Sequence, residues 1–189
     1  MASWLFLAAL GVALIYAIML YNGLVSLKHN VAQAWANIDV VLKQRHDELP
    51  KLIEVCKQQR DFESSTLERV IAARSQVSDA RQHQDVEALG KAEGSLRASL
   101  GRLFAVAEDY PELRSNENFL ALQQRISNLE DAIADRRELY NAAVNINNVR
   151  VEQFPDLIVA RMFRFDTKPL LEFAAAEKAD VDVAALFAR

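Results

Sequence analysis

The chain has 189 residues, of which 51% are hydrophobic and 25% are charged, and its formal net charge at pH 7 is −4. This length suits one compact domain together with a separate apolar segment, and a second domain is not expected. With 5 Gly and 4 Pro among abundant Ala, Leu, Glu, Gln and Arg, the composition predicts an all-α protein. Lys and Arg are spread along the chain and offer no basic stripe for a phosphate backbone, which disfavours nucleic acid as a partner.

The chain begins with an apolar segment, WLFLAALGVALIYAIMLY, which spans residues 4–21 and contains no charged side chain. About 20 apolar residues at ~1.5 Å each cover the ~30 Å hydrocarbon core of a bilayer, so this segment is long enough to cross a membrane. A cleaved signal peptide is the alternative, but it requires a basic start and small residues before the cleavage site. Near the end of this run the residues are bulky, so we expect an uncleaved anchor over residues 1–24.

Basic residues after the apolar segment set the expected orientation. Trp4 and Tyr21 stand at the two ends of the run, where aromatic rings favour the headgroup zone. Lys28, Lys43 and Arg45 follow the run and no basic side chain precedes it, which favours a short N-terminus outside and a cytoplasmic body. The charge difference is small, so a periplasmic body stays an alternative.

Apolar residues at helical spacing continue from the anchor into the rest of the chain. From Leu24 to Val55 they recur mostly at intervals of three and four, which is one face of a helix, and no glycine-proline turn separates the anchor from this stretch. The sequence therefore predicts one long helix that leaves the membrane and runs to about Ala80. Pro50 removes a backbone hydrogen bond within this helix, so we expect a kink there or a helix boundary just before it.

A second helix is predicted from Asp85, acting as its N-cap, to about Ala107. It contains three of the five glycines, Gly90, Gly94 and Gly101, on one side. Each glycine costs a helix ~1 kcal/mol relative to Ala, so we expect a neighbouring helix to approach closely over them. Simple tolerance of the glycines is the alternative.

A third long helix and a short fourth helix are predicted next. Ser115 or Asn116 caps the third helix, which continues to Phe154. Pro155 ends it and suits the first turn of a fourth helix that ends near Phe163. The expected organisation is thus an anchor at residues 1–24, an antiparallel bundle of three long helices plus the short fourth at 25–165, and a tail at 166–189.

Aromatic residues gather at the C-terminal end, where the last 36 residues hold five of the nine Phe. We expect these rings to dock back on the bundle, because such large apolar side chains need a surface to cover. The alternative is a contact with the membrane surface or a partner. The residues concerned are Phe163, Phe165, Phe173 and Phe187 for docking, and Arg161, Phe163, Arg164 and Phe165 for the alternative.

Chemistry-bearing side chains form no recognisable catalytic or metal-binding pattern. His29, His46 and His83 lack ligand spacing, so we predict no catalytic, cofactor-binding or metal-binding residues and no cofactor. The most suggestive polar cluster is Arg45, His46 and Asp47, just before Pro50. Even there, an Arg whose stem packs while its head meets a carboxylate is the preferred interpretation.

Two further features have plain structural interpretations. Arg137, Asn141, Asn145 and Asn148 form a polar stripe at helical spacing, which interhelical hydrogen bonds or a wet face explain as well as a ligand does. Cys56 is the single cysteine and lies among apolar residues, so we expect a small buried hydrophobe rather than a reactive thiol.

Several longer motifs are specific when taken together. They are YNGLVSLKHNVAQAWANIDVVLKQRHDELPKLIEV at residues 21–55, then VIAARS, YPELRSNENFLALQQ, RRELYNAAVN and FPDLIVARMF. On these motifs the chain resembles the LemA family of bacterial membrane proteins over nearly its whole length. It departs from the family pattern at residues 146–148, which read Ile-Asn-Asn where an aromatic-Asn pair is usual, and at Arg164, where the family often has Gly.

The resemblance implies a single N-terminal anchor, an antiparallel bundle of long helices, and a body in the cytoplasm behind a short external N-terminus. The family has no established enzymatic activity and no general cofactor. One relative in magnetotactic bacteria is tied to magnetosome membrane formation, which implies membrane organisation only at the level of a class.

The leading hypothesis is a membrane-anchored scaffold or interaction protein of the bacterial plasma membrane, and not an enzyme. Its expected partners are the lipid bilayer, unidentified proteins and a second copy of the chain. The first alternative is a ligand-binding regulator or enzyme with a site between helices near Arg45, His46 and Asp47. A further alternative is an exported domain that faces the periplasm or the cell wall.

Overall fold

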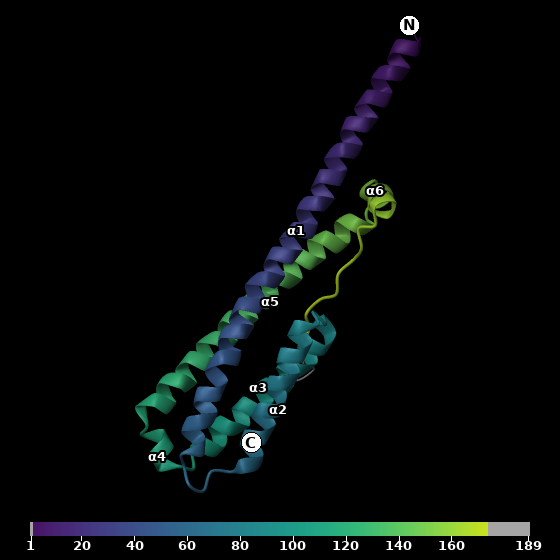
Figure 1. Ribbon diagram of the computed structural model, residues 1–189. Coiled ribbons are helices and arrows are strands. Elements are labelled where there is room, and N and C mark those ends of the chain that lie inside the picture. The colour runs from purple at the N-terminus through teal and green to yellow at the C-terminus, as the bar shows by residue number, and fades with distance from the viewer. Residues whose placement is uncertain (1, 174–189) are drawn as a thin grey trace, which may run out of the picture. The chain divides into compact units, whose positions relative to one another are not determined.

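The computed structural model describes residues 2–173, and every regular element in this range is a helix (Figure 1). The all-α prediction is confirmed. The tail residues 174–189, with Phe187 among them, lie outside the described range. The helices, in chain order, are α1 (Ala2–Lys57), α2 (Ser64–Gln82), α3 (Val86–Ala107), α4 (Pro111–Arg114), α5 (Glu117–Glu152) and α6 (Asp156–Phe163).

The first helix is shorter than the sequence predicts. α1 ends at Lys57 and α2 begins at Ser64, so the expected continuous helix to about Ala80 is wrong. The buried ring of Phe62 fixes the turn, because it packs against Tyr110 with the ring centroids 5.2 Å apart. The Tyr110 hydroxyl also donates to a backbone carbonyl of the turn at 2.7 Å. This turn divides the predicted first helix, so residues 2–173 form four long helices instead of three.

Pro50 lies inside α1, so the alternative of a helix boundary just before it is also wrong. Proline removes one backbone hydrogen bond from a helix, and packing must offset that loss. Leu49 and Leu52 flank it and are fully buried. Their burial stabilises the helix on both sides of the interruption, as tertiary packing does for most helices.

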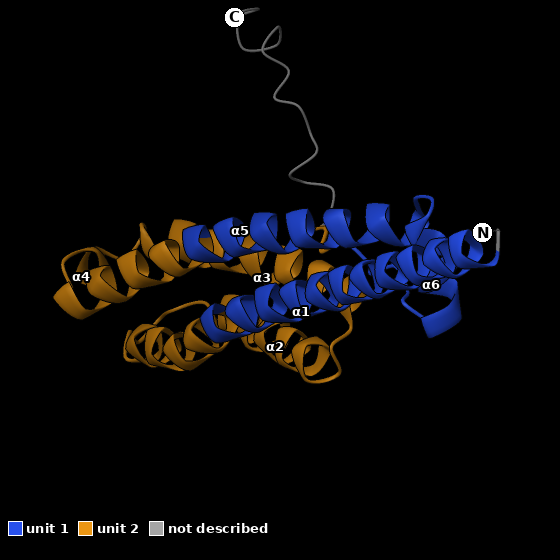
Figure 2. Cartoon of the chain, turned by 90° about the horizontal axis from the view of Figure 1, so that it is seen from above, with its two compact units in different colours: residues 1–41, 131–170 blue, residues 42–130, 171–189 orange. Residues whose placement is uncertain are grey.

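The chain forms two compact units, which Figure 2 colours separately. Unit 1 comprises residues 1–41 and 131–170, and unit 2 comprises residues 42–130 and 171–189. Each unit therefore contains part of α1 and part of α5. The predicted division into anchor, bundle and tail rests on a different criterion, the membrane, and stays a prediction.

Unit 1 packs around the part of α1 that follows the apolar run. Leu24 is fully buried and forms a cluster with residues of α5 and α6, against which Leu20 and Phe165 pack. Further along, Trp35 meets Tyr140 edge to face with ring centroids 5.6 Å apart. The other members of the Leu24 cluster are Val151, Val159 and Ala160.

Unit 2 has a leucine-rich core, and its helix starts follow the predicted caps. Asp85 Oδ1 accepts from the Ala88 amide at 2.9 Å to begin α3, and Asn116 Oδ1 accepts from the Phe119 amide at 3.1 Å to begin α5. Capping of this kind satisfies amides that have no partner within the helix. Its fully buried core side chains include Leu42, Leu49, Leu52, Leu89, Leu96, Leu100, Leu103 and Ile126.

The glycines of α3 differ in what lies beside them, and no helix is the neighbour at either Gly90 or Gly101. A Cβ at Gly90 would lie 2.0 Å from the carbonyl oxygen of Glu172, so the non-helical chain at 171–173 occupies the space where a neighbouring helix was expected. Gly101 meets nothing within 4 Å, so simple tolerance, the alternative, holds there. The prediction of close approach is right for Gly90 and wrong about its partner.

Candidate functional site

The polar cluster before Pro50 begins with a buried ion pair. Arg45 and Glu93 of α3 are each 2% exposed and form a hydrogen-bonded ion pair through Nη2 and Oε1. The preferred interpretation of Arg45, a packed stem with its head on a carboxylate, is confirmed. Because each charge has left water, removal of either partner would leave the other unpaired in the core.

His46 turns instead to α2. Arg74 Nη2 lies 2.7 Å from His46 Nε2, and Arg74 Nε donates to the His46 carbonyl oxygen at 3.1 Å. A guanidinium is always a donor, so His46 Nε2 must accept and the imidazole carries its proton on Nδ1. Burial and then the charge of Arg74 lower the pKa of His46 from its ordinary value of 6.5. The ring is therefore a neutral acceptor at neutral pH.

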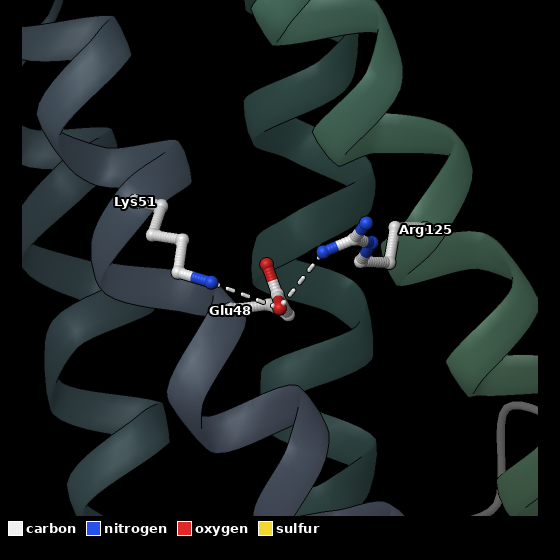
Figure 3. A network of polar contacts seen from close by, with 3 residues as sticks. All are labelled: Glu48, Lys51 and Arg125. Carbon is white, nitrogen blue, oxygen red and sulfur yellow. Dashed lines mark hydrogen bonds and ion pairs between the residues drawn. The ribbon is translucent and has the colours of Figure 1, made fainter.

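Glu48 reaches the third neighbouring helix, α5. Its Oε1 accepts from Lys51 at 3.0 Å and from Arg125 at 3.2 Å, and Figure 3 shows the carboxylate between these two cations. The hydrogen bond from Lys51 is the main cause that lowers the pKa of Glu48, and Arg125 acts in the same direction. Within unit 2, one turn of α1 thus contacts α2, α3 and α5 through three different polar side chains.

The proposed ligand site gains no support from this arrangement. Arg45 and His46 turn to different helices and Asp47 is exposed, so the three residues do not converge. This turn of α1 connects helices of the unit, which is a structural task. The alternative of an enzyme or ligand-binding regulator stays a prediction.

The polar stripe of α5 includes one residue that holds the chain after α6. Asn148 Nδ2 donates to the Lys168 carbonyl at 2.9 Å, and its Oδ1 accepts from the Lys168 amide at 2.8 Å. Asn145 is exposed, whereas Arg137 and Asn141 are half-buried. The expected interhelical bonding is therefore replaced at Asn148 by bonding to a non-helical backbone.

Sequence reasoning missed two other residues that hold this segment. Asn147 is buried and its Nδ2 lies 3.4 Å from the Asp166 carbonyl oxygen, while the Tyr140 hydroxyl donates to the Pro169 carbonyl at 3.1 Å. Burial raises the pKa of Tyr140. A signal was present, because Asn147 stands at helical spacing with the apolar Tyr140 and Val144, on the inward face of α5.

The described residues also offer no reactive thiol and no metal-binding cluster. Cys56 is fully buried and burial raises the pKa of its thiol to about 12, which confirms its interpretation as a small hydrophobe. Among residues 2–173, no group of three or more His, Cys, Asp or Glu is arranged to hold a metal ion.

A hollow of about 460 Å³ lies between α2 and α3 and is lined by three alanines and six polar or charged residues. Two of its lining side chains are already engaged, because Lys91 pairs with Glu87 at 2.7 Å and His83 Nδ1 lies 2.8 Å from the Asp79 carbonyl oxygen. None of the residues predicted for a ligand site lines it.

The junction between the apolar run and the rest of unit 1 is formed by aromatic rings. Tyr21 meets Phe163 and Phe165 edge to face, with ring centroids 4.8 and 5.7 Å apart. The prediction that these rings dock back is confirmed for Phe165, which also packs on the Leu24 cluster, whereas Phe163 meets Tyr21 and stays 54% exposed. An ion pair between Arg150 Nη2 and the buried Asp156 Oδ1, at 2.7 Å, connects α5 to α6 at the same place.

The run itself, from Trp4 to Met19, is exposed along its length. By length and composition, α1 is the one helix among the described residues that is able to cross a membrane. Apolar side chains that no other part of the described chain covers are what a membrane-crossing helix presents to lipid.

A model of the LemA family matches residues 34–184, which is most of the chain. The chain belongs to the LemA family. The match covers the helical body and begins after the apolar run. Family membership and the apolar α1 together support a membrane-associated protein.

Similar proteins carry the names of two groups. Protein LemA of Metamycoplasma hominis is 26% identical over 167 residues, covering 87% of this chain and 74% of that protein. Magnetosome protein MamQ 2 of Paramagnetospirillum magneticum is 24% identical and magnetosome protein MamQ of Magnetospirillum gryphiswaldense is 22% identical, each over 161 residues and 73% of this chain. The chain spans 59% of the length of these MamQ relatives.

Proposed function

We propose that this LemA-family chain is a membrane-anchored helical scaffold of the bacterial plasma membrane that presents an apolar helix face to partner proteins. The observation that carries the proposal is an exposed stripe on α5 formed by Leu139, Ala142, Ile146 and Val149. Leu139, Ile146 and Val149 are 61%, 53% and 51% exposed. We call these four residues the α5 stripe.

The spacing of the α5 stripe indicates what fits it. Its members are separated by three, four and three residues, which is the narrow seam along which one helix packs on another. A helix face that meets only water ordinarily carries polar side chains at such positions. The stripe therefore suits an amphipathic helix laid along α5, supplied by another protein or by a second copy of this chain.

The anchor completes the proposal. The exposed apolar run of α1 spans the bilayer, with the short N-terminus outside and the body in the cytoplasm, and this confines the α5 stripe to the membrane surface. No catalytic step is assigned to the chain.

Photo-cross-linking tests the partner surface. A photoreactive amino acid is placed at Ile146 of the full chain in native membranes, with Arg136, an exposed residue of α5 outside the stripe, as the matched control. We expect discrete protein adducts from Ile146 that are absent from Arg136. Adducts that are equal at the two positions, or none at Ile146, would overturn the assignment of the stripe.

Labelling of an introduced cysteine tests the orientation. The native Cys56 cannot report it, because the thiol is buried and its pKa is raised to about 12. The exposed Lys91 is replaced in a Lys91→Cys variant, and an impermeant maleimide is added to intact and to permeabilised cells. A cytoplasmic body predicts labelling only after permeabilisation. Labelling in intact cells would establish the periplasmic alternative.

A further inference from the structure

α6 is apolar on nearly all sides, yet only one side of it is covered. Its sequence, DLIVARMF, contains two charged residues, and its covered side includes Val159 and Ala160. On the other side Ile158 is 54% and Met162 is 71% exposed, and Phe154, just before the helix, is 79% exposed. A helix that is apolar all round is ordinarily buried, but no part of residues 2–173 covers this side of α6.

The position of α6 within unit 1 indicates what that environment is. Phe163 at its end packs on Tyr21, the last residue of the exposed apolar run of α1, and Val159 packs on Leu24. Figures 1 and 2 show α6 lying crosswise to α1. If α1 crosses the bilayer, α6 lies along the membrane surface at the depth of Tyr21, where the headgroups begin.

The charges around α6 suit phosphate groups. Arg161 and Arg164 are exposed, whereas Arg150 and Asp156 neutralise each other in their ion pair. The nearest exposed acidic residues in sequence are Glu152 before α6 and Asp166 after it, and Lys168 follows them. α6 itself therefore presents cations and apolar side chains together, as helices that lie at a membrane surface do.

The backbone at Arg164 is a second, independent sign. This residue ends α6 in the left-handed conformation, with φ 58° and ψ 47°. Glycine is the ordinary residue at such a helix end, because a Cβ is disfavoured there. An arginine here has a less favourable backbone conformation than a glycine would have. Because the chain carries arginine in spite of this cost, we infer that its charge beside α6 is used.

We propose that α6 is a second membrane contact, which lies in the headgroup region of the bilayer that α1 crosses. Phe154, Ile158 and Met162 enter the acyl boundary, and Arg161 and Arg164 bind lipid phosphates. Phe163 and Phe165 pack on Tyr21 and connect this contact to the anchor. The proposal rests on α1 spanning the bilayer, but it does not depend on any partner of the α5 stripe. Two attachments hold unit 1 in one orientation to the membrane, which a single helix does not.

Depth-dependent fluorescence quenching tests the contact in the full chain. The protein is reconstituted in phosphatidylcholine vesicles with about 30% phosphatidylglycerol, which supplies a negative surface potential. An environment-sensitive fluorophore is attached to Met162→Cys, while the buried Cys56 stays unlabelled. Nitroxide lipids quench either near the headgroups or near the bilayer centre. We expect several-fold stronger quenching of this probe by the headgroup nitroxide than by the central one.

Two control positions on α1 make the result decisive. Leu14→Cys lies within the apolar run and is expected to respond to the central nitroxide. Ala36→Cys is exposed on α1 about 15 residues, or roughly 22 Å, beyond Tyr21 and is expected to respond to neither. If Leu14 is quenched and Met162 behaves as Ala36 does, the membrane contact of α6 is wrong while the anchor stands. If Leu14 is not quenched, the anchor and the contact both fail.

The arginines are tested by Arg161→Gln combined with Arg164→Gly, which retains a residue suited to the left-handed backbone. We expect weaker headgroup quenching at Met162 in anionic vesicles, about fivefold in the docking equilibrium for each charge removed, and little change in pure phosphatidylcholine. Equal quenching with and without the arginines in anionic vesicles would overturn their phosphate contacts. A protein adduct from a photo-cross-linker at Met162, together with no quenching, would assign this face to a protein instead.

Discussion

The two units differ most in how much apolar surface they leave exposed. In unit 2 the polar residues of α1 are matched within the unit, since Arg45 meets Glu93, His46 meets Arg74 and Glu48 meets Arg125. In unit 1 three apolar surfaces are left exposed: the run before Tyr21, the α5 stripe and the outer side of α6. These three polar side chains of α1 therefore have their partners inside unit 2. A unit with exposed apolar surfaces is made to contact something else.

The largest expected effect on stability comes from breaking the buried Arg45–Glu93 ion pair of unit 2. Glu93→Leu leaves the buried Arg45 charge unpaired and is expected to lower the free energy of unfolding by about 3–5 kcal/mol. The matched double variant, Arg45→Met with Glu93→Leu, removes both charges and is expected to recover most of that loss. Chemical denaturation of the full chain in detergent, followed by circular dichroism, measures both. A double variant no more stable than Glu93→Leu would contradict the pairing.

The glycines of α3 test how closely residues 171–173 pack on α3 within unit 2. Gly90→Ala sets a Cβ against the Glu172 carbonyl and is expected to destabilise the chain by about 1–3 kcal/mol. Gly101→Ala meets open space and is expected to stabilise α3 by about 0.5–1 kcal/mol. The same denaturation experiment compares them. If both substitutions stabilise, the close approach at Gly90 is absent.

Asn148 tests the attachment of the chain after α6 within unit 1. Asn148→Ala removes two hydrogen bonds to the Lys168 backbone and is expected to cost about 1–2 kcal/mol, with faster hydrogen exchange at the Lys168 amide. The exposed Asn145→Ala is the control and is expected to change stability by less than about 0.5 kcal/mol. Unchanged exchange at Lys168 in Asn148→Ala would show that these bonds do not hold the segment.

The smallest effect is a pH dependence from His46. Its folded pKa lies below the ordinary 6.5, so the unfolded chain takes up the proton first and stability is lost as pH falls below about 6.5. Glu48 has a lowered pKa and contributes stability that is lost only below its ordinary value of 4.5, outside this window. We expect a lower denaturation midpoint at about pH 5.5 than at about pH 7.5, and a smaller difference in His46→Gln. An equal difference in both chains would exclude His46 as the cause.

Local sequence signals predict where helices begin, but they do not predict a turn that is fixed by residues far apart in the sequence. Asp85 and Asn116 were identifiable as caps, because a capping side chain acts on amides a few residues away. The turn after Lys57 has no Gly or Pro, and its fixed point is Phe62 against Tyr110, a contact between residues far apart in the sequence. A helical pattern on both sides therefore predicted one helix where there are two.

The candidate site was predictable to a similar extent. That the Arg45 head would meet a carboxylate follows from the cost of burying a lone charge, but the choice of Glu93 depends on how α3 packs. Gly90 predicted a close approach but did not identify the partner, because the partner is the backbone of a segment more than 80 residues later in the chain. Sequence patterns thus indicate which kind of contact a residue requires, and the tertiary fold decides which group provides that contact.

Hydroxyl-radical footprinting tests the contrast between the units most directly. The full chain is oxidised in native membranes and, separately, after purification in detergent. We expect Ile146 and Val149 of unit 1 to be protected in the membrane, while Ile71 and Leu120, exposed residues of unit 2, react equally in both preparations. Equal oxidation of Ile146 and Val149 in the two preparations would contradict the claim that unit 1 presents its apolar surfaces to partners.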